Sequence, residues 1–158
     1  MSNIIKIYTD GSCHTQLRIG AWAALLLLDS EKIILSGVQE DTTHNHMELL
    51  AVIKSIEYLN EHFISFDQLE VYTDSQYVAG INDRREKLKG NNFITKSGNT
   101  IQNDDLIKKL ILQIETNTIT FVKVKAHQKA ITIHNYNREV DKIVRAVLRE
   151  SVSKSTTV

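Results

Sequence analysis

Two aspartates in this chain follow short runs of strand-forming residues that both end in Tyr-Thr. These are Asp10, which precedes Gly-Ser, and Asp74, which precedes Ser-Gln. The ends of strands are where α/β folds place functional side chains, so the two carboxylates can emerge side by side. Adjacent carboxylates repel unless a cation neutralises them, and hard oxygen ligands without a cysteine cluster favour Mg²⁺ or Mn²⁺ over zinc. The pattern therefore indicates a candidate cation site.

Two further acidic residues fall where a helix is expected to begin. Glu48 lies in the first turn of a predicted helix, and Asp141 lies in the first turn of the last one. Taken singly, each acidic residue has a simpler explanation, because an Asp at a strand end or a Glu in a first helical turn is more often a turn residue or a cap. Only the combination of four favours a site.

The elements that must position these residues follow from hydrophobic periodicity. Alternating or short apolar runs predict strands at residues 4–9, 21–28, 32–38, 69–73 and 119–124. Helical spacing predicts helices at residues 47–63, with Thr42 or Thr43 as N-cap, at 75–81, at 106–114, and over a last stripe from Val140 to Leu148. Helical crossovers join parallel strands, so this order implies an α/β fold with a mixed five-stranded sheet flanked by helices.

Composition limits the class of protein. A chain of 158 residues without a linker predicts one domain over residues 1–151 and a flexible tail over residues 152–158. The single cysteine, Cys13, excludes a disulfide framework, and the longest apolar run, residues 21–28, is too short to span a membrane. We expect a cytoplasmic protein and a monomer. The net charge is zero, so any polyanion site must be local. Residues 82–102 carry five basic and two acidic residues and form a basic excursion.

Four motifs in this order resemble the type 1 ribonuclease H family. They are Thr-Asp-Gly-Ser-Cys at residues 9–13, Thr-Thr-His-Asn-His-Met-Glu-Leu at 42–49, Tyr-Thr-Asp-Ser-Gln-Tyr-Val at 72–78 and Asn-Arg-Glu-Val-Asp at 137–141. The resemblance implies the ribonuclease H-like fold with strand order 3-2-1-4-5. It also implies a catalytic and metal-binding site of Asp10, Glu48, Asp74 and Asp141, and cleavage of the RNA strand of an RNA/DNA hybrid.

The resemblance further implies a two-metal mechanism. Two Mg²⁺ ions, with Mn²⁺ as a possible substitute, would activate water and steady the leaving oxygen, which leaves a 5′-phosphate and a 3′-hydroxyl. Asp10 would bridge both ions, Asp74 would help the nucleophile-side ion, and Glu48 and Asp141 would complete the shells. His127 matches the family's mobile histidine, and His134 is its rival because the loop between them departs from the family pattern.

Substrate contacts are also expected from the resemblance. The basic excursion resembles the family's handle, although Phe93 lies where the family usually has a tryptophan. Thr43 is either a phosphate ligand or only an N-cap. His44 and His46 permit a zinc reading of the same segment, which spacing does not favour over a contact from Asn45. The predicted substrate-binding residues are Cys13, Gln16, Thr43, Asn45, Gln76, Arg84, Arg85, Lys87, Lys89 and Asn137, with Lys96 as a further basic candidate.

Two other classes of protein share features with this sequence. Integrases, transposases and resolvases have the same fold but usually a different acidic pattern. A non-catalytic hybrid-binding module would keep the fold without metals, yet an idle cluster of four carboxylates would lower stability by repulsion. The chain has no phosphate-binding Gly-x-x-x-x-Gly-Lys-Ser/Thr loop and no Gly-x-Ser-x-Gly nucleophile elbow.

Overall fold

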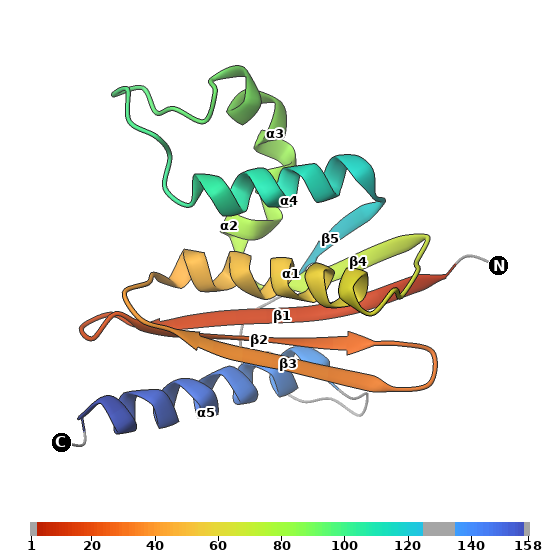
Figure 1. Ribbon diagram of the computed structural model, residues 1–158, viewed down its shortest axis with the longest axis vertical. Coiled ribbons are helices and arrows are strands. Elements are labelled where there is room, and N and C mark those ends of the chain that lie inside the picture. Colours follow the sequence, from red (N-terminus) through yellow and green to blue (C-terminus); the bar gives the residue numbers. More distant parts are fainter. Residues whose placement is uncertain (1–2, 125–134, 157–158) are drawn as a thin grey trace.

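A mixed five-stranded sheet in the order β3-β2-β1-β4-β5 forms the centre of the protein (Figure 1). The computed structural model describes residues 3–124 and 135–156. Its strands are β1 (Ile4–His14), β2 (Ile19–Leu27), β3 (Lys32–Gln39), β4 (Gln68–Thr73) and β5 (Ile119–Lys123). The first three strands form an antiparallel meander, and β4 and β5 add in parallel. The predicted α/β fold and strand order are confirmed.

Within residues 3–124 and 135–156, five helices connect and cover the strands. They are α1 (His44–Glu61), α2 (Gln76–Ala79), α3 (Ile81–Gly90), α4 (Asp104–Thr116) and α5 (Tyr136–Thr156). Helix α1 begins at His44 because Thr43 has an extended backbone and its hydroxyl accepts a hydrogen bond from the His46 N–H at 3.2 Å. The predicted start at Met47 was therefore late, and Glu48 lies beyond the first turn.

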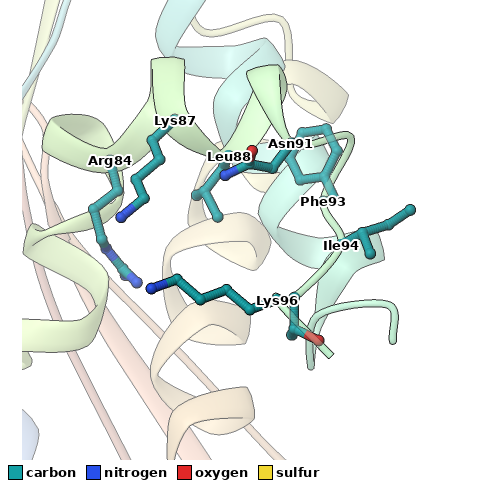
Figure 2. Close-up of a pocket in the computed structure, with 8 residues that line it drawn as sticks. Arg84, Lys87, Leu88, Asn91, Phe93, Ile94 and Lys96 are labelled. Carbon is teal, nitrogen blue, oxygen red and sulfur yellow. The ribbon is translucent and has the colours of Figure 1, made fainter. Parts of the chain in front are cut away.

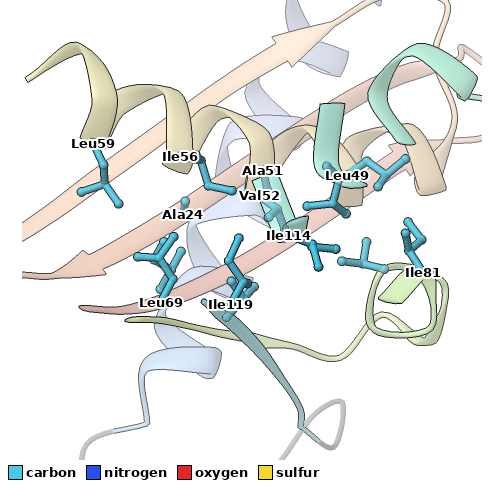
Figure 3. Packing of buried hydrophobic residues seen from close by; sticks show 14 of the residues in the cluster. Ala24, Leu49, Ala51, Val52, Ile56, Leu59, Leu69, Ile81, Ile114 and Ile119 are labelled. Carbon is cyan, nitrogen blue, oxygen red and sulfur yellow. The ribbon is translucent and has the colours of Figure 1, made fainter. Parts of the chain in front are cut away.

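Two apolar layers hold the helices on the sheet. Helices α1 and α4 lie on one face and α5 lies on the other (Figure 1). The larger layer joins buried side chains of both helices to the strands, and it includes Ile56, Ile114, Leu69 and Ile119 (Figure 3). Burial of one such side chain contributes about 1.5 to 3 kcal/mol. Trp22 is buried in this layer, as predicted.

The first strand is longer than its sequence indicates. A stop at Thr9 was predicted because Asp-Gly-Ser is a poor strand former. Strand β1 instead continues to His14, since β2 pairs with it from Lys6 to His14, where the last pair is His14 with Ile19. The prediction that this strand stops at Thr9, just before Asp10, was wrong, because backbone pairing in the hairpin outweighs local propensity.

Two other regions are more helical than predicted. Part of the basic excursion, where periodicity is weak, forms α3, and α5 continues to Thr156 into the segment expected to be a flexible tail. The last turn of α5 carries an ion pair between Lys154 and Glu150 at 3.1 Å, and such pairs four residues apart support a helix. Among the residues that the structure describes, no helix is both long enough and apolar enough to cross a membrane.

Candidate active site

The parallel pairing of β1 with β4 brings two aspartates together. Tyr8 is the register partner of Tyr72, and their rings stack with centroids 4.5 Å apart. Asp10 and Asp74 each follow their tyrosine by two residues, and residues two apart on a strand share a face. The pairing of the two strands stops at this tyrosine pair. The two carboxylates therefore lie side by side where the strands separate, as the sequence pattern indicated.

Glu48 reaches the same point from α1 because Gly11 lets the helix approach the strand. A Cβ atom at Gly11 would lie 2.5 Å from the carbonyl carbon of Met47 and 2.6 Å from the backbone nitrogen of Glu48, so only glycine fits there. One carboxylate oxygen each from Asp10, Glu48 and Asp74 lie within 4.8 Å of one another. We call these three residues the acidic cluster.

The acidic cluster holds carboxylates in a place that disfavours their charge. Burial, followed by repulsion from Asp74 and Asp141, raises the pKa of Asp10 to about 7, although the Gly11 N–H donates to its carboxylate at 2.9 Å. Burial and then the charges of Asp10 and Asp74 raise the pKa of Glu48 well above its usual range. Glu48 Oε2 is buried without a hydrogen-bond partner among the described residues. Crowded, under-satisfied oxygens fit a hard divalent cation.

Asp141 borders the acidic cluster from α5. A hydrogen bond and repulsion between its carboxyl group and that of Asp10 both help to raise the pKa of Asp10. On its other side, Asp141 Oδ2 lies 3.1 Å from Arg145 Nε, one helical turn along. Asp141 was predicted in the first turn of the last helix. It lies beyond the first turn of α5, because this helix already begins at Tyr136.

Comparison with known proteins identifies the family. A family model described as RNase H matches residues 2–149. The chain belongs to the RNase H family. The Ribonuclease H of Caldicellulosiruptor saccharolyticus is 32% identical to it over 92% of this chain and 97% of that protein. The Ribonuclease H of Thermoanaerobacter sp. strain X514 is 32% identical over 98% of each chain, and that of Chlorobium phaeobacteroides strain DSM 266 is 33% identical over 96% and 99%. The protein is thus an RNase H-type hydrolase.

The residues expected to contact an RNase H substrate near the acidic cluster occupy several elements. Three of these side chains are exposed: Gln16 in the β1–β2 connection, Asn45 in the first turn of α1, and Gln76, the first residue of α2. Asn137, near the start of α5, is half-buried. Cys13 is half-buried and its thiol donates to the Thr42 carbonyl at 3.5 Å. Burial raises the pKa of this thiol, which disfavours a reactive thiolate. The hydroxyl of Thr43 is engaged as the cap of α1.

The predicted basic residues divide into two groups. Arg84 and Lys87 of α3 and Lys96 of the following loop line a groove of about 250 Å³, and their nitrogen atoms point toward one another (Figure 2). We call this the basic groove. Lys89 points elsewhere and forms an ion pair with Glu115 of α4 at 2.8 Å. The hydrogen bond from Lys89 lowers the pKa of Glu115. Arg85 does not line the basic groove, and its Nε lies 3.7 Å from Glu86 Oε1. Only the first group is therefore directed at the basic groove.

The apolar wall of the basic groove includes the residue that replaces the expected tryptophan. Phe93 is half-buried, packs against the main core and has a left-handed backbone with φ of 58°. The Lys108 ammonium lies 5.2 Å from the centre of its ring. A ring that is packed below and covered by a cation offers little surface for a base to stack on.

The histidines of the candidate site have separate surroundings. His127 and His134 both lie outside the described residues. His44 Nε2 lies 3.4 Å from Glu48 Oε1, whereas His46 Nδ1 lies 2.9 Å from Asn103 Oδ1. Within residues 3–124 and 135–156, the acidic cluster is the one group of three or more potential metal ligands. The zinc alternative built on His44 and His46 therefore gains no support.

Three contacts to the acidic residues were missed at the level of sequence. His44 and Arg145 stand four residues before Glu48 and four residues after Asp141, a spacing that places opposite charges on one helix face. This spacing could have been read directly. The role of Gly11 as a point of helix approach depends on how α1 crosses β1, and no local pattern predicts that crossing.

Proposed function

We propose that this RNase H-family protein is an endonuclease that hydrolyses the RNA strand of RNA/DNA hybrids with two divalent ions, Mg²⁺ or alternatively Mn²⁺, and leaves 5′-phosphate and 3′-hydroxyl ends. The observation that carries the proposal is the acidic cluster, with ligand oxygens of Asp10, Glu48 and Asp74 within 4.8 Å of one another. The raised pKa values of Asp10 and Glu48 and the buried, unpartnered oxygen on Glu48 support the proposal of a cation at this cluster.

The four acidic residues are proposed to hold the ions together. Asp10, Glu48 and Asp74 are the proposed ligands, and Asp141 completes the site from α5. Bound divalent ions would supply a lowered pKa for a water nucleophile and charge stabilisation for the leaving oxygen. The Gly11 N–H orients Asp10, and α1 holds Glu48 rigidly, so both carboxylates are preorganised. His127 remains the sequence-based candidate for proton transfer or product departure, with His134 as its rival.

Substrate binding is proposed to combine the basic groove with polar groups around the acidic cluster. Phosphate contacts dominate the affinity of nucleic-acid-binding proteins, and Arg84, Lys87 and Lys96 direct three cations at one groove. Arg85 and Lys89 are secondary candidates, because Lys89 forms an ion pair with Glu115 and Arg85 Nε lies 3.7 Å from Glu86 Oε1. Recognition of the RNA 2′-hydroxyl would come from backbone and side-chain polar groups near Cys13, Glu48 and Gln76. Further substrate contacts are proposed for Gln16, Thr43, Asn45 and Asn137.

A cleavage assay with matched duplexes tests the proposal. End-labelled RNA annealed to DNA is compared with RNA/RNA and DNA/DNA duplexes, with Mg²⁺, Mn²⁺ or EDTA, for the native protein and Asp10→Asn. We expect metal-dependent internal cutting of RNA in the hybrid alone, loss of cutting in Asp10→Asn, and products that a 5′-phosphate-dependent exonuclease can degrade. Hybrid binding without cutting in any metal would instead identify a binding module.

The active unit is proposed to be a monomer in the cytoplasm. The acidic cluster and the basic groove are each formed by residues of one chain, so no second subunit is needed to complete either.

A further inference from the structure

Asp141 differs from the other three proposed cation ligands in its surroundings. Among the residues that the structure describes, those of the acidic cluster have ligand oxygens within 4.8 Å of one another, and Asp141 is not a member of this group. Its carboxyl group meets the acidic cluster at Asp10, with which it shares a hydrogen bond. Asp141 is 32% exposed, whereas Glu48 is 1% exposed. Asp141 therefore borders the acidic cluster without being enclosed in it.

Arg145 contacts the same carboxylate from one helical turn further along α5. Its Nε lies 3.1 Å from Asp141 Oδ2. An acidic residue four positions before a basic one is the favourable order for an ion pair on a helix, so α5 itself promotes this contact. A guanidinium stays protonated in proteins. A positive charge is thus present beside Asp141 whether or not an ion is bound.

The other basic neighbour of a proposed ligand is of a different kind. His44 Nε2 lies 3.4 Å from Glu48 Oε1, and a histidine is charged only when it is protonated. Of these two pairs, only that of Asp141 contains a permanent cation.

We propose that Arg145 is a positioning residue that acts through Asp141 and lowers the affinity of the active site for divalent ions. This inference rests on the proposed function, in which Asp141 is a cation ligand. The guanidinium and a divalent ion compete for one carboxylate, and the two positive charges also repel each other. The active site therefore binds ions less tightly than its four carboxylates would without Arg145, and cleavage needs a higher Mg²⁺ concentration.

A purely structural role for the ion pair predicts a different outcome. Arg145 and Asp141 are 57% and 32% exposed, and an ion pair between groups this exposed contributes little to stability. Loss of the guanidinium should therefore leave thermal unfolding of the metal-free protein almost unchanged. An effect on ion affinity can thus be separated from an effect on folding.

Isothermal titration calorimetry of the metal-free protein with Mn²⁺, without substrate, tests the inference. We expect Arg145→Gln to bind Mn²⁺ about three- to tenfold more tightly than the native protein, because one partly screened charge beside a divalent ion is removed. Arg149→Gln is the matched control. It removes the same charge from an exposed residue one turn further along α5 and should bind like the native protein. Arg145→Lys keeps the charge and should show a smaller gain than Arg145→Gln.

A double variant locates the effect at Asp141. If Arg145 acts through this carboxylate, Arg145→Gln should change the affinity much less in the Asp141→Asn background than in the native protein. In steady-state cleavage, Arg145→Gln should also lower the Mg²⁺ concentration that gives half the maximal rate.

Three results would overturn the inference: unchanged or weaker Mn²⁺ binding by Arg145→Gln, the same gain in Arg149→Gln, or a full gain in the Asp141→Asn background. The expected binding pattern in a protein that does not cut hybrids would overturn the proposed nuclease and not the role of Arg145. A native protein that binds no Mn²⁺ would overturn both.

Discussion

The acidic cluster and the basic groove carry opposite charges, and the chain holds them in place in different ways. Asp10 and Asp74 are fixed by strand pairing, and Glu48 is fixed by a helix that touches the strand backbone at Gly11. The cations of the basic groove stand on long side chains of α3 and its loop, outside the sheet. Backbone pairing thus determines the position of the carboxylates. The cations take their directions from contacts of their own side chains, such as those of Arg84 with the Gly80 carbonyl and of Lys89 with Glu115.

Charge has different consequences in the two regions. In the acidic cluster, like charges are buried together, so the group is unfavourable until a cation or protons neutralise it. In the basic excursion, residues 82–102, Lys89 already has the carboxylate of Glu115 beside it, whereas Lys87 lines the basic groove. Cleavage activity should therefore be sensitive to the replacement of a single oxygen atom in the acidic cluster. Substrate affinity should fall gradually with each positive charge lost from the basic groove.

The largest expected effect comes from Asp10→Asn. The amide keeps the size of the side chain but removes the charge at the centre of the acidic cluster, and we expect kcat to fall on the order of 10³-fold. Steady-state cleavage of a hybrid in Mg²⁺ measures this. Asp105→Asn, at an exposed residue of α4, should leave the rate unchanged. Similar losses in both variants would remove the distinction between the acidic cluster and other surface carboxylates.

Gly11→Ala should be the next most damaging change. Its Cβ would lie within 3 Å of backbone atoms of α1, so either the helix or the strand must shift. We expect the free energy of unfolding to fall by about 2 to 3 kcal/mol, as in overpacked cores, together with a loss of cleavage. Denaturant unfolding measures the first. In Gly90→Ala the new Cβ meets nothing within 4 Å, and this variant should be neutral or slightly more stable.

The metal-free protein should lose stability as pH rises through about 7. The pKa of Asp10 in the folded protein, about 7, is above its ordinary value of 3.8. The stabilising contribution of the protonated form is therefore complete below the ordinary value and lost as pH rises through 7. Because Asp10 is partly exposed, we expect a change of roughly 1 to 2 kcal/mol between pH 5 and pH 8.

Thermal and denaturant unfolding in EDTA, with and without excess Mg²⁺, measure this dependence. Mg²⁺ should restore stability at pH 8, and Asp10→Asn should flatten the profile in EDTA. An unchanged profile in Asp10→Asn would assign the pH dependence to other groups.

The smallest effects should separate the two groups of basic residues. Lys87→Ala removes a cation of the basic groove and should raise KM for the hybrid severalfold, with the salt dependence of binding reduced by about one unit in the log-log slope. Lys89→Ala breaks the ion pair with Glu115 and should change both quantities less. Equal effects would mean that the direction of the side chain does not decide which lysine meets phosphate.

Much of the acidic cluster could be predicted from sequence because its determinants are local. The apolar runs before Asp10 and Asp74 predict the two strands. Tyr8 and Tyr72, each of which precedes the threonine before its aspartate, are register partners in the structure. The extension of β1 to His14 could not be predicted in the same way. It depends on the match in length between β1 and β2, and the local residues alone favour a stop.

The structure of the basic excursion and the directions of its side chains were harder to predict. The sequence indicated its charge but not the helix α3, whose apolar positions are few. It also gave Lys87 and Lys89 the same expectation, because the position of Glu115 on α4 is set by tertiary packing. A long flexible side chain takes its direction from such partners, so composition alone cannot separate the two lysines.

The pairing of β1 with β4 also has a consequence for the order of assembly. Asp10 and Glu48 belong to the meander and α1, which a growing chain can complete from local contacts. Asp74 joins them only when β4 docks beside β1 across the whole intervening segment, and non-local parallel pairing is a slow step in folding. Asp141 on α5 arrives later still in synthesis. A nascent chain therefore exposes an incomplete set of the proposed cation ligands, and we expect the site to bind a cation only after the long-range closure of the sheet.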